Sequence, residues 1–228
     1  MDSHGSHADV TGRGRRRSRA ASRALERELA RLGYKAVVGL DEAGCGALAG
    51  PVVAGAVIMD PDVLIPHLTD SKMLTPGDRS ALLAEVRAAS RAWAMALVLP
   101  HDIDRINIYN ARMLAMSWAV AALAIDPDFA VVDGPALPPL NIPAKPLVDG
   151  DRKCRVVAAG SIVAKVVRDT IMEKIDALYP QYHFALHKGY ATRQHLDAIE
   201  RYGPCPVHRM SFAPLTRLSQ GSLDFGAT

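Results

Sequence analysis

Two neighbouring carboxylates follow a short apolar run near the start of the chain. Residues 37–40 are Val, Val, Gly and Leu, and Asp41 and Glu42 come directly after them, ahead of a glycine-rich turn. Adjacent carboxylates repel each other, so in a protected site one is driven toward protonation unless a cation neutralises the pair. A hard divalent cation such as Mg²⁺ does so, because it takes oxygen ligands from a few carboxylates and a substrate phosphate. A solvated acid pair at a strand end is the alternative.

Two further strand ends repeat this pattern. The apolar run 129–132 ends in Asp133, and the short segment 145–148 leads into acidic residues that include Asp151. If these strands lie beside the first one, their acids reach the edge where ligands bind in open α/β sheets. A single aspartate after a strand is more often a turn former. Three acidic strand ends together favour a metal site.

The surrounding sequence predicts an α/β domain that positions these strand ends. Strands are expected at about 37–40, 52–59, 93–99, 129–132 and 145–148, and helices at about 24–32, 75–91, 109–123, 157–179 and 192–202. The first two strands should form an antiparallel pair. The helix at 109–123 is nearly uncharged and is expected to be buried. In the helix at 157–179, Lys165, Arg168 and Lys174 are expected to face solvent.

Basic and aromatic residues precede the last of these helices. Tyr190 follows Lys188 and a glycine, and a tyrosine in such a segment can stack on a sugar or base. Packing of this ring in a corner of the core is the alternative. The proline-rich segment 203–214, which contains His208 and Arg209, is expected to fold back on the domain.

Length and charge predict one folded domain. The chain has 228 residues and a net charge of +3, which permits a nucleic-acid partner without requiring one. We expect the domain over 23–218, between disordered tails at 1–22 and 219–228. The first tail is rich in arginine, which indicates either a solvated segment or non-specific attraction to phosphates.

Cysteine spacing and hydropathy predict the compartment. The three cysteines, Cys45, Cys154 and Cys205, are far apart and form no zinc or disulfide pattern. No apolar run reaches the length of a membrane span, and the N-terminus has no signal-peptide core. A cytoplasmic protein is therefore expected.

The order of the motifs resembles ribonuclease HII, the prokaryotic type 2 ribonuclease H. The resemblance covers about Tyr34 to Leu215 and rests on eight motifs in order. They are Asp41-Glu42-Ala43-Gly44, Ala49-Gly50-Pro51, Asp70-Ser71-Lys72, Val132-Asp133-Gly134, Gly150-Asp151, AAGSIVAKVVRD at 158–169, His187-Lys188-Gly189-Tyr190 and Arg209-Met210-Ser211-Phe212. This resemblance implies a ribonuclease H-like mixed five-stranded sheet flanked by helices, with a C-terminal helical extension.

The resemblance also implies an activity and its cofactor. A member of this family is a metal-dependent endoribonuclease that hydrolyses the RNA strand of RNA/DNA hybrids and incises 5′ of single ribonucleotides in duplex DNA. Asp41, Glu42, Asp133 and Asp151 would bind two Mg²⁺ or Mn²⁺ ions, with Asp41 as the bridging ligand. Products would carry 5′-phosphate and 3′-hydroxyl ends. The partners implied are these nucleic acids and no membrane, and we expect a monomer.

Eight positions match substrate contacts of the family: Gly44, Cys45, Gly46, Lys72, Ser161, Lys165, Lys188 and Tyr190. Lys72 resembles a phosphate contact, and Tyr190 resembles the residue that stacks on the deoxyribose just 3′ of the scissile ribonucleotide. One position departs from the pattern. The family turn reads Gly-Arg-Gly and its backbone reads the 2′-hydroxyl, whereas this chain has Cys45 in the middle. Both glycines are retained, so the lost charge bears on affinity and on junction preference.

Two other functions fit the acidic strand ends. A four-carboxylate 3′–5′ exonuclease uses the same metal chemistry, but only an endonuclease nicks a closed circular duplex. A non-catalytic module that binds RNA–DNA junctions would accommodate the altered turn at Cys45, although the four retained acids argue against it.

Overall fold

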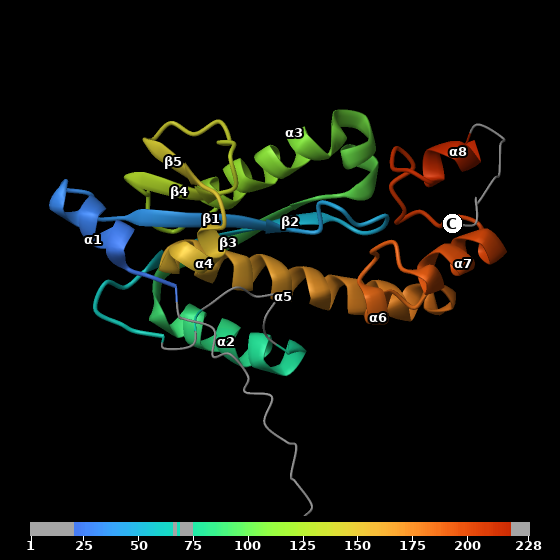
Figure 1. Cartoon of the computed structure of the whole chain (residues 1–228), viewed down its shortest axis with the longest axis horizontal. Helices are drawn as coiled ribbons and strands as arrows, with labels where there is room; N and C mark the ends of the chain where they lie inside the picture. Colours follow the sequence, from blue (N-terminus) through green and yellow to red (C-terminus); the bar gives the residue numbers. More distant parts are fainter. Residues whose placement is uncertain (1–20, 66–67, 69–74, 220–228) are drawn as a thin grey trace, which may run out of the picture.

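The fold is built on a mixed five-stranded sheet with the strand order β3-β2-β1-β4-β5 (Figure 1). The computed structural model describes residues 21–65, 68 and 75–219. The strands are β1 Val37–Ala43, β2 Val52–Met59, β3 Ser90–Val98, β4 Phe129–Asp133 and β5 Ala144–Leu147. The helices are α1 Ala24–Arg31, α2 Pro76–Ala89, α3 Pro100–Ala121, α4 Gly150–Lys153, α5 Arg155–Leu178, α6 Phe184–His187, α7 Arg193–Tyr202 and α8 Leu215–Ser219, with a 3₁₀ turn at Pro180–Tyr182. The predicted sheet and its flanking helices are confirmed.

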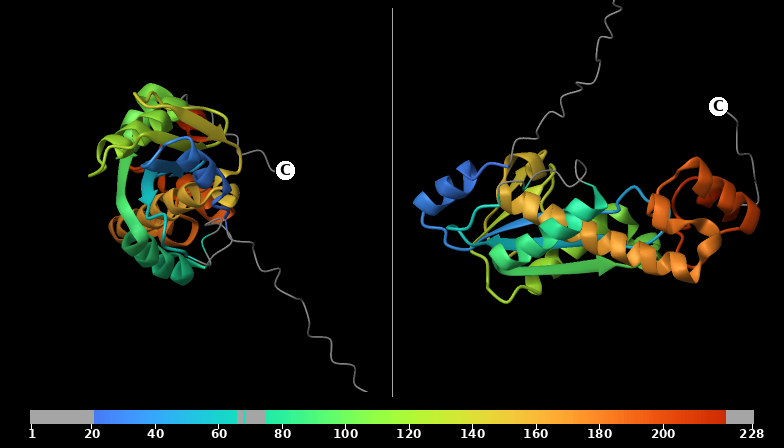
Figure 2. Two further views of the ribbon diagram at one scale, coloured as in Figure 1. Left: turned by 90° about the vertical axis from the view of Figure 1, so that its left-hand side faces the viewer. Right: turned by 90° about the horizontal axis from the view of Figure 1, so that it is seen from below.

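Helices cover both faces of the sheet. Helix α3 packs on one face, and α5 packs on the other with α2 on its outer side (Figures 1 and 2). Strand β2 lies between these layers and is buried at every position. A strand covered on both faces needs apolar side chains on both. This explains why residues 52–59 form a continuous apolar run.

Strand pairing brings two of the acidic strand ends together. Strand β1 pairs antiparallel with β2, as predicted, and parallel with β4, with Leu40 opposite Val132. Asp41 and Asp133 are the next residues on the two strands. Because carboxyl ends of parallel strands share one edge, the two acids lie at the same edge of the sheet.

Three glycines let helix α5 lie directly on the sheet. A Cβ at Gly39 would overlap the backbone of Val156 and Val157, and a Cβ at Gly55 would overlap the carbonyl oxygen of Gly160. A Cβ at Gly160 would come within 3.0 Å of the Gly39 carbonyl oxygen. Backbone therefore meets backbone where α5 crosses β1 and β2. This contact fixes the helix against the strand that ends in Asp41.

The helix predicted at 109–123 starts earlier than predicted and is only partly buried. Pro100, expected to close the preceding strand, is instead the first residue of α3, where proline is favoured because its missing N–H is not needed. Asn107 has φ 65° and ψ 164°, so two helical segments meet there. Tyr109 and Trp118 on the outer face are about half exposed. The apolar composition reflected one buried stripe of alanine and methionine, not burial on all sides.

The other helix boundaries agree more closely with the sequence. Thr75 caps α2, and its side chain and that of Asp78 form the reciprocal bonds of a capping box. Thr192 caps α7 through the His195 N–H. At the N-terminus, residues 21 and 22, placed by the sequence in the tail, bond to the domain: the Ala21 N–H donates to the Leu68 carbonyl, and the Ser22 carbonyl accepts from the Arg155 N–H.

The C-terminal extension lies beyond one end of the sheet, where α6, α7 and α8 gather at the far end of α5 (Figure 1). Segment 203–214 folds back as predicted, because Ala49 forms a β-bridge with His208 and the Arg209 N–H donates to the Leu48 carbonyl. The extension therefore attaches to the loop between β1 and β2.

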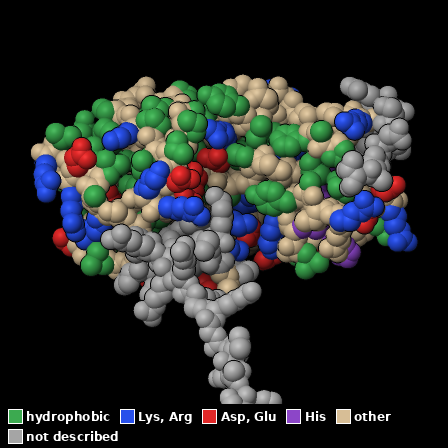
Figure 3. Space-filling model, in the orientation of Figure 1, with side chains coloured by type: hydrophobic (Ala, Val, Ile, Leu, Met, Phe, Trp, Pro, Cys, Tyr) green, Lys and Arg blue, Asp and Glu red, His purple; other side chains and the backbone are tan. Residues whose placement is uncertain are grey.

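The face of the molecule shown in Figure 3 mixes charges of both signs, with Lys and Arg beside Asp and Glu. The described side chains visible on that face form no continuous basic surface. Within the described part of the chain, no helix is long and apolar enough to cross a membrane.

Candidate active site

Four acidic residues lie along one edge of the sheet. Asp41 and Glu42 lie on β1, Asp133 ends β4, and Asp151 lies in the first turn of α4. The Gly150 N–H donates to Asp133 Oδ1 (2.7 Å), which holds α4 against β4. Asp41 and Asp151 are only 6% and 4% exposed. Asp41 and Asp133 thus share one edge of the sheet, and the Gly150 bond holds the short helix that carries Asp151 at the same edge.

The neighbouring acids make ionisation of Asp41 unfavourable. Burial raises the pKa of Asp41 well above its ordinary value, and the charges of Glu42 and Asp133 raise it further. A hydrogen bond from Ser161 on α5 and one from the Glu42 N–H oppose this shift. Ser161 was predicted as a substrate contact, and the structure places it against Asp41.

Glu42 takes part in a charged contact with helix α3. Arg112 Nη1 lies 3.2 Å from Glu42 Oε1, and the Cys45 thiol donates to the same oxygen at 3.4 Å. Burial, followed by the charge of Glu42, raises the pKa of Cys45 to about 12. The residue that departs from the family pattern is therefore a neutral thiol directed at an acid of the site.

The donor set fits a hard divalent cation. All four candidates are carboxylates, and the mutual repulsion around Asp41 is what a bound cation would relieve. Among the described residues, no group of three or more His, Cys, Asp or Glu side chains is arranged closely enough to hold a metal ion. Glu42 pairs with Arg112, and Asp133 accepts from Gly150, so these carboxylates would have to turn toward a cation.

Two buried arginines support the turn that follows the acids. Arg168 on α5 donates to the carbonyls of Pro51 (3.0 Å) and Ala49 (3.1 Å). Arg209 donates to the carbonyls of Gly50 (2.9 Å) and Cys45 (3.0 Å). Planar guanidinium groups with several donors suit this task, because each one can satisfy two loop carbonyls at once. The two arginines therefore hold the backbone of the loop at residues 44–51 from the interior of the protein.

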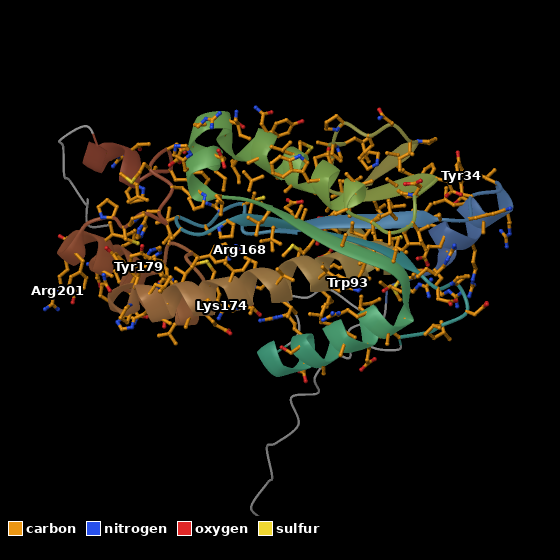
Figure 4. The ribbon with its side chains drawn as sticks, turned by 180° about the vertical axis from the view of Figure 1, so that it is seen from behind. Tyr34, Trp93, Arg168, Lys174, Tyr179 and Arg201 are labelled. Atoms are coloured by element: carbon orange, nitrogen blue, oxygen red, sulfur yellow. The ribbon has the colours of Figure 1, made fainter. Side chains whose placement is uncertain are left out.

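The prediction that Arg168 faces solvent is wrong. Its side chain is 0% exposed and lies between α5 and the loops at the end of the sheet, whereas Lys174 lies on the outer side of the helix (Figure 4). Position 168 belongs to the inner stripe of α5, together with Ser161, Ala164 and Met172, which are also buried. The 3.6-residue periodicity of the helix places position 168 on the buried face, but the charge of arginine favoured the prediction of an exposed side chain.

The loop that carries Tyr190 lies against the same turn. The Leu48 N–H donates to the Gly189 carbonyl (2.8 Å), and a Cβ at Gly189 would come within 2.5 Å of the Ala49 carbonyl oxygen. The Tyr190 ring is 38% exposed and lies 5.4 Å from the Arg168 guanidinium. A partly exposed ring beside the turn is better suited to stacking on a substrate than to packing in the core.

The remaining predicted substrate contacts are scattered. Lys165 Nζ pairs with Asp169 Oδ1 at 2.7 Å, and Lys188 Nζ pairs with Glu173 Oε1 at 2.7 Å. Lys72 lies outside the described residues. Gly46 is exposed, and Gly44 is buried with φ 96°. The turn thus follows directly on the acids of β1, and Tyr190 lies beside the loop that continues from it. A substrate role for Tyr190 and for the two described lysines stays a prediction.

Comparison with known proteins agrees with the family resemblance of the sequence motifs. Residues 38–215 match the profile of the family described as Ribonuclease HII. A Ribonuclease HII of Caldicellulosiruptor saccharolyticus is 49% identical over 188 residues, covering 82% of this chain and 92% of the relative. One of Idiomarina loihiensis is 50% identical over 182 residues, covering 80% and 97%. Among solved structures, the ribonuclease H2 from Pyrococcus horikoshii OT3 superposes with a TM-score of 0.70 at 25% identity, covering 82% of this chain and 98% of that one.

Proposed function

The chain belongs to the ribonuclease HII family of endonucleases, and from this premise we propose that it incises duplex DNA on the 5′ side of single embedded ribonucleotides, as well as the RNA strand of RNA/DNA hybrids. The observation that carries the proposal is the position of Asp41. It is a buried carboxylate whose pKa is raised by burial and by the charges of Glu42 and Asp133. A site that concentrates negative charge in this way is built to bind cations and, through them, a phosphodiester.

Asp41, Glu42, Asp133 and Asp151 would hold the metal. Two divalent ions, Mg²⁺ or Mn²⁺, would supply an activated water and stabilise the leaving 3′-oxygen, which gives 5′-phosphate and 3′-hydroxyl ends. Asp41 is the proposed bridging ligand, because the charges of both Glu42, on its own strand, and Asp133, at the end of the next, act on its carboxylate. Ser161 donates to the Asp41 carboxylate and so favours its charged form.

The turn at residues 44–46 would read the 2′-hydroxyl through its backbone. Arg209 holds the Cys45 carbonyl of this turn from the interior, and Arg168 holds the Ala49 carbonyl further along the same loop. Gly46 is exposed and has no Cβ, so a sugar can approach its backbone closely. Readout by backbone groups is compatible with any side chain at Cys45.

Two glycine substitutions separate the shape of the turn from the approach of substrate. A Cβ at Gly44 would overlap Arg168 at a positive φ, so Gly44→Ala should lower both melting temperature and cleavage. A Cβ at Gly46 meets no described heavy atom within 4 Å, so Gly46→Ala should keep the melting temperature. It should still weaken binding of a single-ribonucleotide duplex by about 1 kcal/mol, the worth of a hydrogen bond. Binding is measured with Ca²⁺ as a non-catalytic ion, and unchanged binding by Gly46→Ala would contradict backbone readout.

Tyr190 is the proposed platform for the deoxyribose that follows the ribonucleotide. Tyr190→Ala should lose about 1–3 kcal/mol of binding, the range for an aromatic stacking contact. The variant should also cut uniform RNA/DNA hybrids relatively better than single embedded ribonucleotides. Tyr190→Phe keeps the ring and should keep the preference. A lower melting temperature with unchanged preference in Tyr190→Ala would identify the ring as packing.

A closed circular duplex with one ribonucleotide tests the proposed function. Incubation with Mg²⁺ or Mn²⁺ should convert the circle to a nicked form with the ribonucleotide at the new 5′ end, and an all-DNA circle should stay intact. Shortening of linear DNA from its 3′ ends, with no nicking of the circle, would identify an exonuclease. Tight binding of the ribonucleotide duplex without cleavage at any metal concentration would identify a binding module.

A further inference from the structure

Two buried histidines in the C-terminal extension form a chain of hydrogen bonds that ends on the backbone of Tyr190. His195 lies on α7 and His208 on the segment that folds back, and their rings are 0% and 3% exposed. His195 Nε2 lies 3.1 Å from His208 Nε2, and His195 Nδ1 lies 2.9 Å from the Tyr190 carbonyl oxygen. We call this pair the histidine relay.

The direction of the relay follows from its two ends. The Tyr190 carbonyl can only accept, so His195 Nδ1 carries the proton and its Nε2 accepts. His208 Nε2 must then donate, and its Nδ1 must accept. The Cys205 N–H lies 2.9 Å from that Nδ1 and supplies the donor. The Tyr190 end therefore sets the tautomers of both neutral rings. At the other end, His208 Nδ1 accepts from the Cys205 N–H, and the Cys205 Sγ and carbonyl oxygen each lie 3.2 Å from the same nitrogen.

The relay is part of a wider set of bonds that fixes the loop around Tyr190. His187 stacks on His195 with ring centroids 4.4 Å apart, and its Nδ1 accepts from the Gly189 N–H at 3.2 Å. The Tyr190 carbonyl also accepts from the Thr192 N–H at 2.8 Å. The backbone is thus held on both sides of a ring that is itself partly exposed.

Protonation of His195 would break the relay. A proton added to His195 Nε2 would place two donors face to face, whereas one added to His208 Nδ1 would exchange the bond from the Cys205 N–H for one to the Cys205 carbonyl oxygen, 3.2 Å away. Burial lowers the pKa of both histidines to about 4, and repulsion from the neighbouring His187 ring, in its protonated form, contributes in each case. The neutral relay therefore persists at neutral pH.

We propose that His195 and His208 are positioning residues for Tyr190: the relay fixes the backbone from which the ring is presented to the sugar. This inference rests on the proposed function, in which Tyr190 is the sugar platform. The histidines contact no substrate themselves. Their removal should change which substrate is preferred, and should do so through Tyr190.

Three substitutions test the relay bond by bond. His195→Phe keeps a ring but removes both hydrogen bonds. His195→Asn keeps an N–H near the Nδ1 position, which can still donate to the Tyr190 carbonyl. His208→Asn keeps an acceptor for the Cys205 N–H but cannot reach His195. His101, exposed on α3, provides a matched control as His101→Phe.

The measurement is the ratio of cleavage of a single-ribonucleotide duplex to cleavage of a uniform RNA/DNA hybrid. His195→Phe and His208→Asn should lower this ratio by a factor of about five or more, the lower end of what a stacking aromatic contributes. His195→Asn should retain most of the wild-type ratio, and His101→Phe should leave the ratio unchanged. Loss of melting temperature with an unchanged ratio in all relay variants would overturn the proposal, because it would assign the relay to stability alone.

A double-mutant cycle separates this inference from the proposed function. If His195 acts through Tyr190, His195→Phe should not change the ratio further in a Tyr190→Ala background. Additive effects would show an independent route and overturn the inference. If Tyr190→Ala by itself leaves the ratio unchanged, the platform role fails. If Tyr190→Ala changes the ratio and His195→Phe does not, only the relay inference fails.

Discussion

Asp41→Asn should abolish cleavage, with a loss on the order of a thousandfold or more, while the fold is kept. The substitution removes the proposed bridging ligand, on which both metal ions depend. It also removes a buried negative charge that repels Glu42 and Asp133. Thermal stability without metal should therefore hold or rise. Asp102→Asn, a matched change of an acid on α3 whose side chain is 45% exposed, should leave cleavage unchanged.

The difference in stability between Asp41→Asn and the wild-type protein should depend on pH in a defined direction. Because the pKa of Asp41 is raised in the folded protein, the folded state holds a proton that the unfolded state has already released above pH of about 4. The wild-type protein thus loses stability as pH rises through this window, and the variant does not. In the presence of a chelator, the melting-temperature advantage of Asp41→Asn should be absent in acid and grow toward neutral pH. Near wild-type turnover, or an advantage that shrinks as pH rises, would remove Asp41 from the centre of the site.

Gly39→Ala should cost about 3 kcal/mol or more of the free energy of unfolding, at the upper end of the range for overpacking. A Cβ at this position would overlap backbone atoms of Val156 and Val157, which have no rotamer by which to move aside. Helix α5 would have to lift from β1, and Ser161 would move away from Asp41. Cleavage should fall with stability.

Gly77→Ala is the matched control for this packing argument. Gly77 lies in the first turn of α2, and a Cβ there meets no described heavy atom within 4 Å. Alanine is a better helix former than glycine, so stability should be unchanged or higher by up to about 1 kcal/mol. Chemical unfolding of both variants, with cleavage assayed at a temperature where each is folded, tests the argument. A Gly39→Ala protein as stable as Gly77→Ala would show that α5 does not rest on this glycine.

Local patterns in the sequence were sufficient to place most of the strands and to single out the acids that follow β1 and β4. An apolar run followed by an acid identified the ends of β1 and β4, and their parallel pairing then placed Asp41 beside Asp133. The antiparallel pairing of β1 and β2 and the cap at Thr75 followed from signals within a few residues. These features are local because backbone propensity, capping and alternation act between near neighbours in the chain.

The sequence by itself determined which residues could do the chemistry, and the tertiary structure decided what holds them. Arg168 was read as a surface residue because its charge was weighed without its partners, yet it is buried on the carbonyls of Ala49 and Pro51, more than a hundred residues away. The histidine relay likewise joins His195 and His208 through a contact that their spacing in the sequence does not predict. A buried polar group is stable only when its hydrogen bonds are satisfied, and for Arg168 the partners are backbone carbonyls distant in the sequence. Such partners exist only once the chain has folded, so the support of the site could be seen only in the folded structure.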